Sequence, residues 1–150
     1  MALSPSVRKP RWWNTLPRMV VLRTPRQEQK LPRFLTVEEV ERLLDAPDTG
    51  TWIGTRDRAI LETLYGAGLR VGGLVGLNAD DVDLRNEVLR VRGKGKKERL
   101  APLGSCAARA TKEYLRMRDD KQFPERDSAA TFISARSGKR LSARSVRRAV

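Results

Sequence analysis

The most restrictive feature of the sequence is a change in the spacing of its apolar residues along the chain. In several segments between residues 36 and 77, apolar side chains recur every three or four positions. This spacing is typical of helices that each bury one face. Leu89 and Val91 then alternate with arginines, a pattern typical of a strand with one buried and one solvated face. The glycine-bearing segment 93–97 separates this strand from a second one at residues 100–103. We therefore expect an α+β fold that is mainly helical, with a small antiparallel β-hairpin or three-stranded sheet.

Capping residues set the expected starts of two helices. Thr36 and Glu39 form a capping-box pattern, and Ser142 is a typical N-cap for the last helix. Leu141 and Val146 are placed to form a hydrophobic staple across that last start. Helices are predicted at residues 36–45, 55–65, 71–77, 107–118 and from 142 onward, a third short strand is predicted at 82–84, and Pro102 favours an edge strand.

Charge is distributed unevenly along the 150 residues. The chain has 31 Lys+Arg and 18 Asp+Glu, a formal net charge of +13. Residues 1–30 carry 7 basic and 1 acidic side chains, residues 31–83 carry 5 and 10, and residues 84–150 carry 19 and 7. The basic second half favours a polyanionic partner, and the alternative is an ordinary solvated surface. Residues 1–30 also contain four prolines, so they are predicted to be an irregular basic arm or linker before a folded domain at 31–150.

The composition excludes several classes of protein. There is no histidine, which excludes Ser-His-Asp and Cys-His catalysis and metal sites with histidine ligands. The single cysteine, Cys106, cannot form a disulfide framework or a cysteine-rich zinc site within the chain. No apolar run approaches the ~20 residues that span a bilayer, and the start of the chain does not have the pattern of a signal peptide. The expectation is a soluble cytoplasmic protein with no metal, no small-molecule cofactor and no membrane partner.

Two cations stand out because of the glycines beside them. Arg70 follows Gly66 and Gly68 at a junction between predicted helices, where its planar fork can bind a phosphate bidentately. Lys94 lies between two glycines of the predicted hairpin turn, from which it can donate to a phosphate or protonate a leaving oxygen. The alternatives are an ordinary surface arginine at a helix start and a solvated charged turn.

Further basic side chains surround the hairpin turn and the last helix. Phosphate anchoring is the functional interpretation of both groups, and a solvated basic face is the alternative. The candidate DNA-binding residues are Lys96, Lys97, Arg99, Arg136, Lys139, Arg140, Arg144 and Arg147.

Several motifs resemble those of one protein family. Residues 31–44, residues 65–71 with their Gly-Ala-Gly-Leu-Arg sequence, and residues 93–103 are similar in order and spacing to the catalytic domain of the tyrosine recombinases. This family is also called the phage-type integrases and includes the bacterial Xer proteins. Residues 132–142 resemble the segment that precedes the family's second arginine motif. The likeness covers residues 31–150 nearly without a gap, and the ordered motifs argue against a general RNA- or ribosome-associated protein.

The resemblance implies a reaction and a role for two residues. Arg70 matches the first active-site arginine, which binds the scissile phosphate, and Lys94 matches the hairpin lysine, which acts as an acid toward the 5′ oxygen. In this family a tyrosine attacks the phosphodiester and forms a 3′-phosphotyrosyl link without metal or cofactor. By this resemblance the chain is a DNA-binding site-specific recombinase or integrase, which acts in DNA breakage, rejoining and integration. Its implied partners are double-stranded DNA and full-length recombinase subunits.

The sequence also departs from the family pattern. Gly73 stands where the family usually has an acidic residue. The family's His-x-x-Arg motif and nucleophilic tyrosine come after the last segment matched here, whereas Tyr65 and Tyr114 lie upstream and are expected in a core or an interface. We therefore expect residues 31–150 to be the N-terminal portion of a catalytic domain, truncated and inactive alone. The alternative is a non-catalytic DNA-binding module, or a decayed fragment, that competes or assists at recombination sites.

Overall fold

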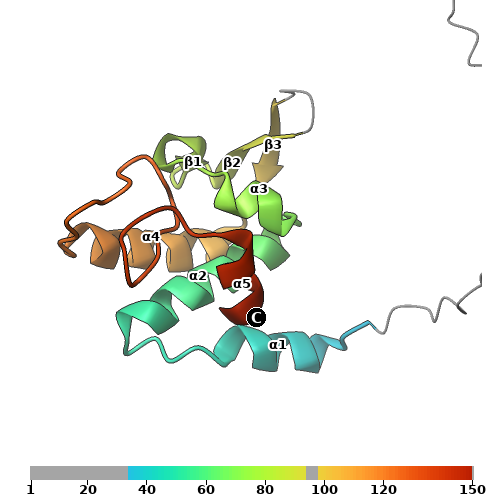
Figure 1. Cartoon of the computed structure of the whole chain (residues 1–150). Coiled ribbons are helices and arrows are strands. Elements are labelled where there is room, and N and C mark those ends of the chain that lie inside the picture. The colour runs from blue at the N-terminus through green and yellow to red at the C-terminus, as the bar shows by residue number, and fades with distance from the viewer. Residues whose placement is uncertain (1–33, 94–97, 150) are drawn as a thin grey trace, which may run out of the picture. The chain divides into compact units, whose positions relative to one another are not determined.

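A computed structural model of the chain describes residues 34–93 and 98–149. The chain divides into a unit of residues 1–34 and a unit of residues 35–150, and the helices and strands of the described residues belong to the second unit (Figure 1). The basic arm predicted at residues 1–30 and the turn lysines Lys94, Lys96 and Lys97 lie outside the described residues.

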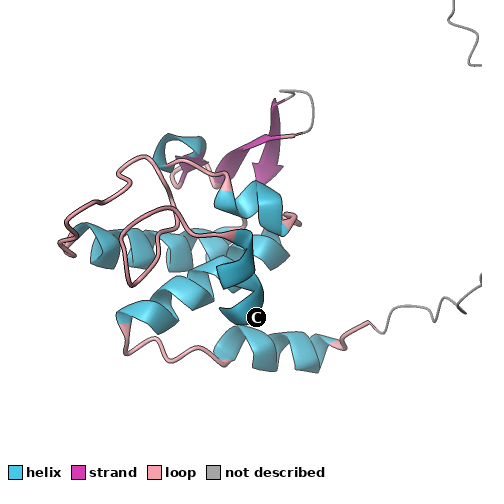
Figure 2. Cartoon of the chain, viewed as in Figure 1, coloured by secondary structure: helices cyan, strands magenta, loops and turns pink. Residues whose placement is uncertain are grey.

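Helices precede and follow a small sheet in the middle of the chain (Figure 2). The elements are α1 (Val37–Asp45), α2 (Trp52–Gly66), α3 (Val71–Val75), the 3-10 turn η2 (Ala79–Asp81), β1 (Val82–Asp83), β2 (Val88–Arg92), β3 (Glu98–Pro102), α4 (Ser105–Asp119) and α5 (Ala143–Ala149). The prediction of a mainly helical α+β fold with a three-stranded antiparallel sheet is confirmed. Among the described residues, no helix is long and apolar enough to span a membrane.

Threonine side chains start the first two helices. The Glu39 amide donates to Thr36 Oγ1 at 3.3 Å and the Thr36 amide donates to the Glu39 carboxylate at 2.8 Å, so the predicted capping box is formed. α2 begins at Trp52, earlier than the predicted start near residue 55, because Thr51 Oγ1 accepts from the Gly54 amide at 3.0 Å. None of the residues of α1 is buried, whereas α2 lies in the core.

The sheet has the strand order β1-β2-β3, and both pairs are antiparallel. Leu89 and Val91 are buried on one face of β2, as their alternation with arginines predicts. In register, Leu89 pairs with Val82 of β1 and with Ala101 of β3. β3 is an edge strand, which agrees with the proline at position 102.

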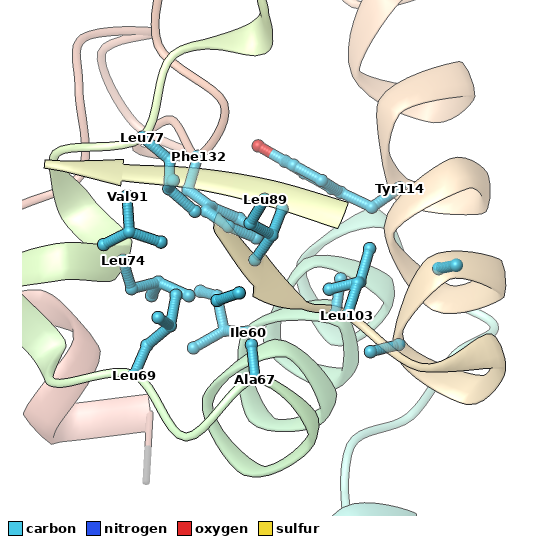
Figure 3. Close-up of a cluster of buried hydrophobic side chains, with 14 of the residues drawn as sticks. Ile60, Ala67, Leu69, Leu74, Leu77, Leu89, Val91, Leu103, Tyr114 and Phe132 are labelled. Carbon is cyan, nitrogen blue, oxygen red and sulfur yellow. The ribbon is translucent and has the colours of Figure 1, made fainter. Parts of the chain in front are cut away.

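The core fills the space between the sheet and the helices α2 and α4, which pack against each other (Figure 3). Ile60 of α2, Leu74 of α3 and Leu103 after β3 are completely buried. Tyr114 of α4 is also buried and stacks on Phe132, with ring centroids 5.4 Å apart. These contacts fix α3 and the sheet against the two long helices.

The segment after α4 returns to the middle of the fold as irregular chain. The Thr131 amide donates to the Leu77 carbonyl at 3.1 Å, and the Leu141 amide donates to the Phe132 carbonyl at 2.9 Å. Ser142 Oγ accepts from the Ser145 amide at 3.1 Å, so the predicted N-cap of the last helix is formed. This route brings α5 into contact with α3 (Figure 1).

Candidate nucleic-acid interface

Arg70 occupies the turn between α2 and α3. Gly68 has a φ of 57°, a left-handed conformation that glycine adopts without strain, and it directs the chain out of α2. Leu69 is buried next to it and holds the turn against the core. The Arg70 carbonyl accepts from the Gly73 amide at 2.8 Å and from the Leu74 amide at 3.1 Å, so its backbone starts α3. Its side chain is exposed.

Four arginines border one cleft of about 720 Å³. They come from four different places in the chain, which are the start of α3, β2, β3 and α5. The residues that line this cleft, called the arginine cleft below, are Leu69, Arg70, Val71, Gly72, Gly73, Val91, Arg92, Gly93, Arg99 and Arg147. The fold therefore brings together three cations predicted from the sequence, and it adds Arg92.

The charges of these four arginines are compensated to different degrees. Arg92 lies 3.2 Å from the Glu98 carboxylate and 3.6 Å from the carboxylate of Asp81, which is buried. Arg70, Arg99 and Arg147 form no ion pair with any carboxylate of the described residues. Uncompensated guanidinium groups in a concave site attract an anion, and phosphate matches their planar forks.

Sequence reasoning missed Arg92 for a physical reason. Its position on the solvated face of β2 was apparent from the alternation, but nothing local distinguishes it from Arg90. Asp81, which orients it, lies in the η2 turn and reaches it only through the pairing of β1 with β2. The acidic pair Asp80-Asp81 before a short strand was the available signal.

The other predicted DNA-binding residues lie in different surroundings. Arg136 and Arg144 are exposed, the first in the turn before α5 and the second on α5 itself. Lys139 is exposed and forms an ion pair with Glu125 at 2.6 Å. Arg140 is directed into the fold instead, and its guanidinium donates to the Leu77 carbonyl at 2.9 Å. Lys94, Lys96 and Lys97 lie outside the described residues.

Gly73 lines the arginine cleft at the position where a carboxylate was expected by resemblance. A Cβ added there would lie 3.5 Å from Val91 Cγ1, which is an ordinary van der Waals contact. The backbone therefore has room for a side chain at this position, and the missing carboxylate is not a consequence of crowding.

The two tyrosines differ in their surroundings. Tyr114 is buried, and its hydroxyl oxygen accepts from the Ile133 amide at 3.1 Å. Burial raises the pKa of Tyr114, although the Ile133 amide and the nearby arginines, Arg118 first, act in the opposite direction. Tyr65 is 62% exposed and lines a separate depression beside α1, so of the two predicted places, a core or an interface, the core is excluded. Within residues 34–93 and 98–149, no three carboxylate or thiol groups gather to hold a metal ion.

Comparison with known proteins shows the family to which the chain belongs. Residues 33–150 match the phage integrase family. The tyrosine recombinase XerC of Thermodesulfovibrio yellowstonii is 44% identical over 126 residues, which cover 82% of this chain and 42% of that protein. XerC of Pelobacter propionicus is 45% identical over 130 residues, which cover 87% and 41%. The chain thus spans about two fifths of the length of these relatives.

Solved structures agree with these matches. A XerA recombinase superposes with a TM-score of 0.68 at 29% identity, over 80% of this chain and 41% of that one. A XerH site-specific recombinase bound to its difH substrate superposes with a TM-score of 0.61 at 26% identity, over 77% and 33%. The extent of the family match and the identity to the XerC proteins show that this chain belongs to the phage integrase family of tyrosine recombinases.

Proposed function

We propose that residues 31–150 are the N-terminal portion of a recombinase catalytic domain, which binds duplex DNA and serves in DNA breakage, rejoining and integration. The observation that supports this most strongly is the convergence of Arg70, Arg99 and Arg147 on the arginine cleft. Their side chains come from positions far apart in the sequence, and no ion pair with the described residues explains their meeting. A DNA phosphate is the ligand that suits three guanidinium groups.

The proposed chemistry is the stabilisation of charge at that phosphate. Arg70 binds the non-bridging oxygens of the scissile phosphate, and the other arginines of the cleft add positive charge before the reaction begins. Such preorganised cations favour the pentavalent state, in which negative charge on the oxygens increases. Lys94 is assigned the role of the acid toward the 5′ oxygen on its sequence motif alone.

Tyr114 is not the nucleophile in this proposal. Its hydroxyl is buried and bonded to the Ile133 amide, and burial raises its pKa, so it is neither accessible nor easily ionised. Tyr65 is accessible but does not line the arginine cleft. The attacking tyrosine therefore comes from outside the residues described.

A wider surface is proposed to follow the DNA backbone on either side of the cleft. It consists of Arg136, Lys139 and Arg144, together with Lys96 and Lys97 on sequence grounds. Arg140 is left out because its guanidinium is already bonded within the protein. Full-length recombinase subunits are the proposed protein partners, and the cytoplasm is the proposed location.

One observation favours a second candidate, a DNA-binding module without catalysis. Gly73 supplies no carboxylate to orient the arginines of the cleft, although a side chain would fit there. In that case the chain would bind at recombination sites and compete with or assist an active relative.

Both candidates require the same cleft to bind DNA, and they differ in strand cleavage. They are separated by assays of a nicked DNA substrate with a full-length XerC relative, with and without this chain. Higher strand cleavage in the presence of the chain supports the portion of a catalytic domain. Lower cleavage, from competition for the substrate, supports the non-catalytic module.

DNA binding itself is tested by titration of a duplex at several salt concentrations. Each phosphate contact contributes about 0.9 to the slope of log affinity against log salt. We expect Arg70→Ala and Arg147→Ala each to weaken binding and to reduce the slope by about one contact. Arg109→Ala on the exposed side of α4 is the matched control, and it should leave the slope unchanged. A flat salt response, or equal effects of all three substitutions, would contradict the proposal.

A further inference from the structure

The helix that begins at Arg70 is intrinsically weak. α3 has five residues, and two of them, Gly72 and Gly73, cost about 1 kcal/mol each relative to alanine in a helix interior. A single short turn does not persist in water without tertiary contacts. Leu74, the fourth of its five residues, is the buried residue of α3. The position of Arg70 therefore depends on the buried side chains of Leu69 and Leu74 and on the contacts that hold the C-terminal end of α3.

Arg140 holds that end. Its Nη1 donates to the carbonyls of Val75 at 3.1 Å and Leu77 at 2.9 Å, and its Nη2 donates to Asn78 Oδ1 at 2.7 Å. The last carbonyls of a helix have no partner within the helix, so Arg140 supplies a donor to Val75, the last residue of α3. The Leu77 carbonyl lies just past the helix and accepts from both Arg140 and the Thr131 amide. The Nε of Arg140 lies 3.3 Å from Asp127 Oδ2, which fixes the plane of the guanidinium from the other side.

The backbone of Arg140 leads directly into α5. Arg140 pairs with Ile133 in an antiparallel bridge, and the next residue but one, Ser142, caps the helix that carries Arg147. α3 and α5 are in contact (Figure 1). Arg140 therefore joins the end of α3, which Arg70 precedes, to the start of α5, which carries Arg147.

The same network continues to a third side of the arginine cleft. Asn78, which accepts from Arg140, donates its backbone amide to Asp81 Oδ2 at 2.9 Å. The other oxygen of that buried carboxylate lies 3.6 Å from Arg92. Arg140 is thus connected by hydrogen bonds and one ion pair to the β2 wall of the cleft.

We propose that Arg140 is a positioning residue that holds Arg70 and Arg147 in one phosphate-binding geometry, an inference that rests on the proposed function. It touches no phosphate and acts through the ends of two helices. Its planar fork makes three hydrogen bonds from two nitrogen atoms in one plane, which the tetrahedral ammonium of lysine does not reproduce. Arg140→Lys therefore keeps the charge and loses the function, which separates positioning from direct attraction of DNA.

A double-mutant cycle with Arg70 tests this role. We expect Arg140→Ala to weaken duplex binding by about fivefold or more in the wild-type background, and by clearly less when Arg70 is already alanine, because only the effect through Arg147 then remains. Arg140→Lys should weaken binding nearly as much as Arg140→Ala. Arg109→Ala should have the same small effect in both backgrounds. Binding is measured at a temperature where circular dichroism shows each variant folded, and the cycle uses Arg140→Lys if the alanine variant does not fold.

The outcomes distinguish the two proposals. Equal losses from Arg140→Ala with and without Arg70, or binding restored by Arg140→Lys, would overturn the positioning role while leaving DNA binding intact. If Arg70→Ala has no effect on binding, the proposed function fails. The positioning role of Arg140 is then tested separately by amide hydrogen exchange. Faster exchange of the Gly73 and Leu74 amides in Arg140→Lys would then support it, and unchanged exchange would overturn it.

Discussion

Replacing Tyr114 with phenylalanine removes one buried hydroxyl and leaves the ring packing against Phe132 in place. The hydroxyl is the acceptor for the Ile133 amide at 3.1 Å, and the residue has no exposed surface. Without it, a buried N–H group loses its partner, which costs about 1–3 kcal/mol. We therefore expect Tyr114→Phe to lower the free energy of unfolding by about 2 kcal/mol at neutral pH.

The same substitution has a predictable dependence on pH. Burial raises the pKa of Tyr114 in the folded state above its ordinary value of about 10. As the pH rises above about 10, the unfolded tyrosine releases its proton while the folded one keeps it, so the wild-type protein loses up to about 1.4 kcal/mol per pH unit. Phenylalanine does not ionise. The difference in stability between the two proteins should therefore shrink above pH 10 and stay constant below it.

Urea denaturation followed by circular dichroism at about pH 7, 9 and 11 measures this difference. Tyr65→Phe is the matched control because that tyrosine is 62% exposed, and it should change stability by less than about 0.5 kcal/mol. A Tyr114→Phe protein as stable as the wild type would refute the assigned hydrogen bond. A difference that is the same at pH 7 and 11 would refute the pKa argument.

Four further substitutions are predicted to change stability in thermal or urea denaturation. Gly72→Ala should stabilise the fold by about 0.5–1 kcal/mol, because a Cβ there meets no atom within 4 Å and alanine favours the helix; a loss of stability would show that α3 needs the glycine. Gly138→Ala should cost at least about 2 kcal/mol, because φ is 70° and the new Cβ would lie 2.6 Å from Phe123 Cβ; an unchanged midpoint would contradict this. Thr51→Ala should cost about 1 kcal/mol and Thr36→Ala clearly less, because α2 lies in the core and no residue of α1 is buried; the reverse order would count against these roles of the two caps.

The parts of the fold that sequence reasoning predicted correctly depend on local chemistry. The capping box at Thr36 and Glu39 needs only residues within one turn, and the alternation of Leu89 and Val91 needs only one strand. The start of α2 was misplaced because several threonines near residue 50 are equally good N-caps. Only the packing of the preceding turn selects Thr51.

The site was predicted only in part because its residues come from distant parts of the sequence. The family resemblance implied that Arg70 and the hairpin act on the same phosphate, and the cleft contains both Arg70 and Arg99 of the hairpin. In the sequence, nothing distinguishes Arg140 from the neighbouring basic residues Arg136, Lys139 and Arg144. Its charge alone therefore suggested contact with DNA. The carbonyls that accept from it in the structure, those of Val75 and Leu77, precede it by more than 60 residues, and only the fold brings them within reach.

The gathering of Arg70, Arg99 and Arg147 also affects folding itself. These like charges are carried by α3, β3 and α5, so their mutual repulsion works to separate three elements of one core. A bound polyanion removes that repulsion and acts as a folding ligand. By mass action, DNA at a hundred times its dissociation constant would stabilise the native chain by about 2.7 kcal/mol. In a cell, the population of correctly folded molecules would then depend on occupancy of nucleic acid, and copies released from DNA would be the ones most exposed to proteolysis.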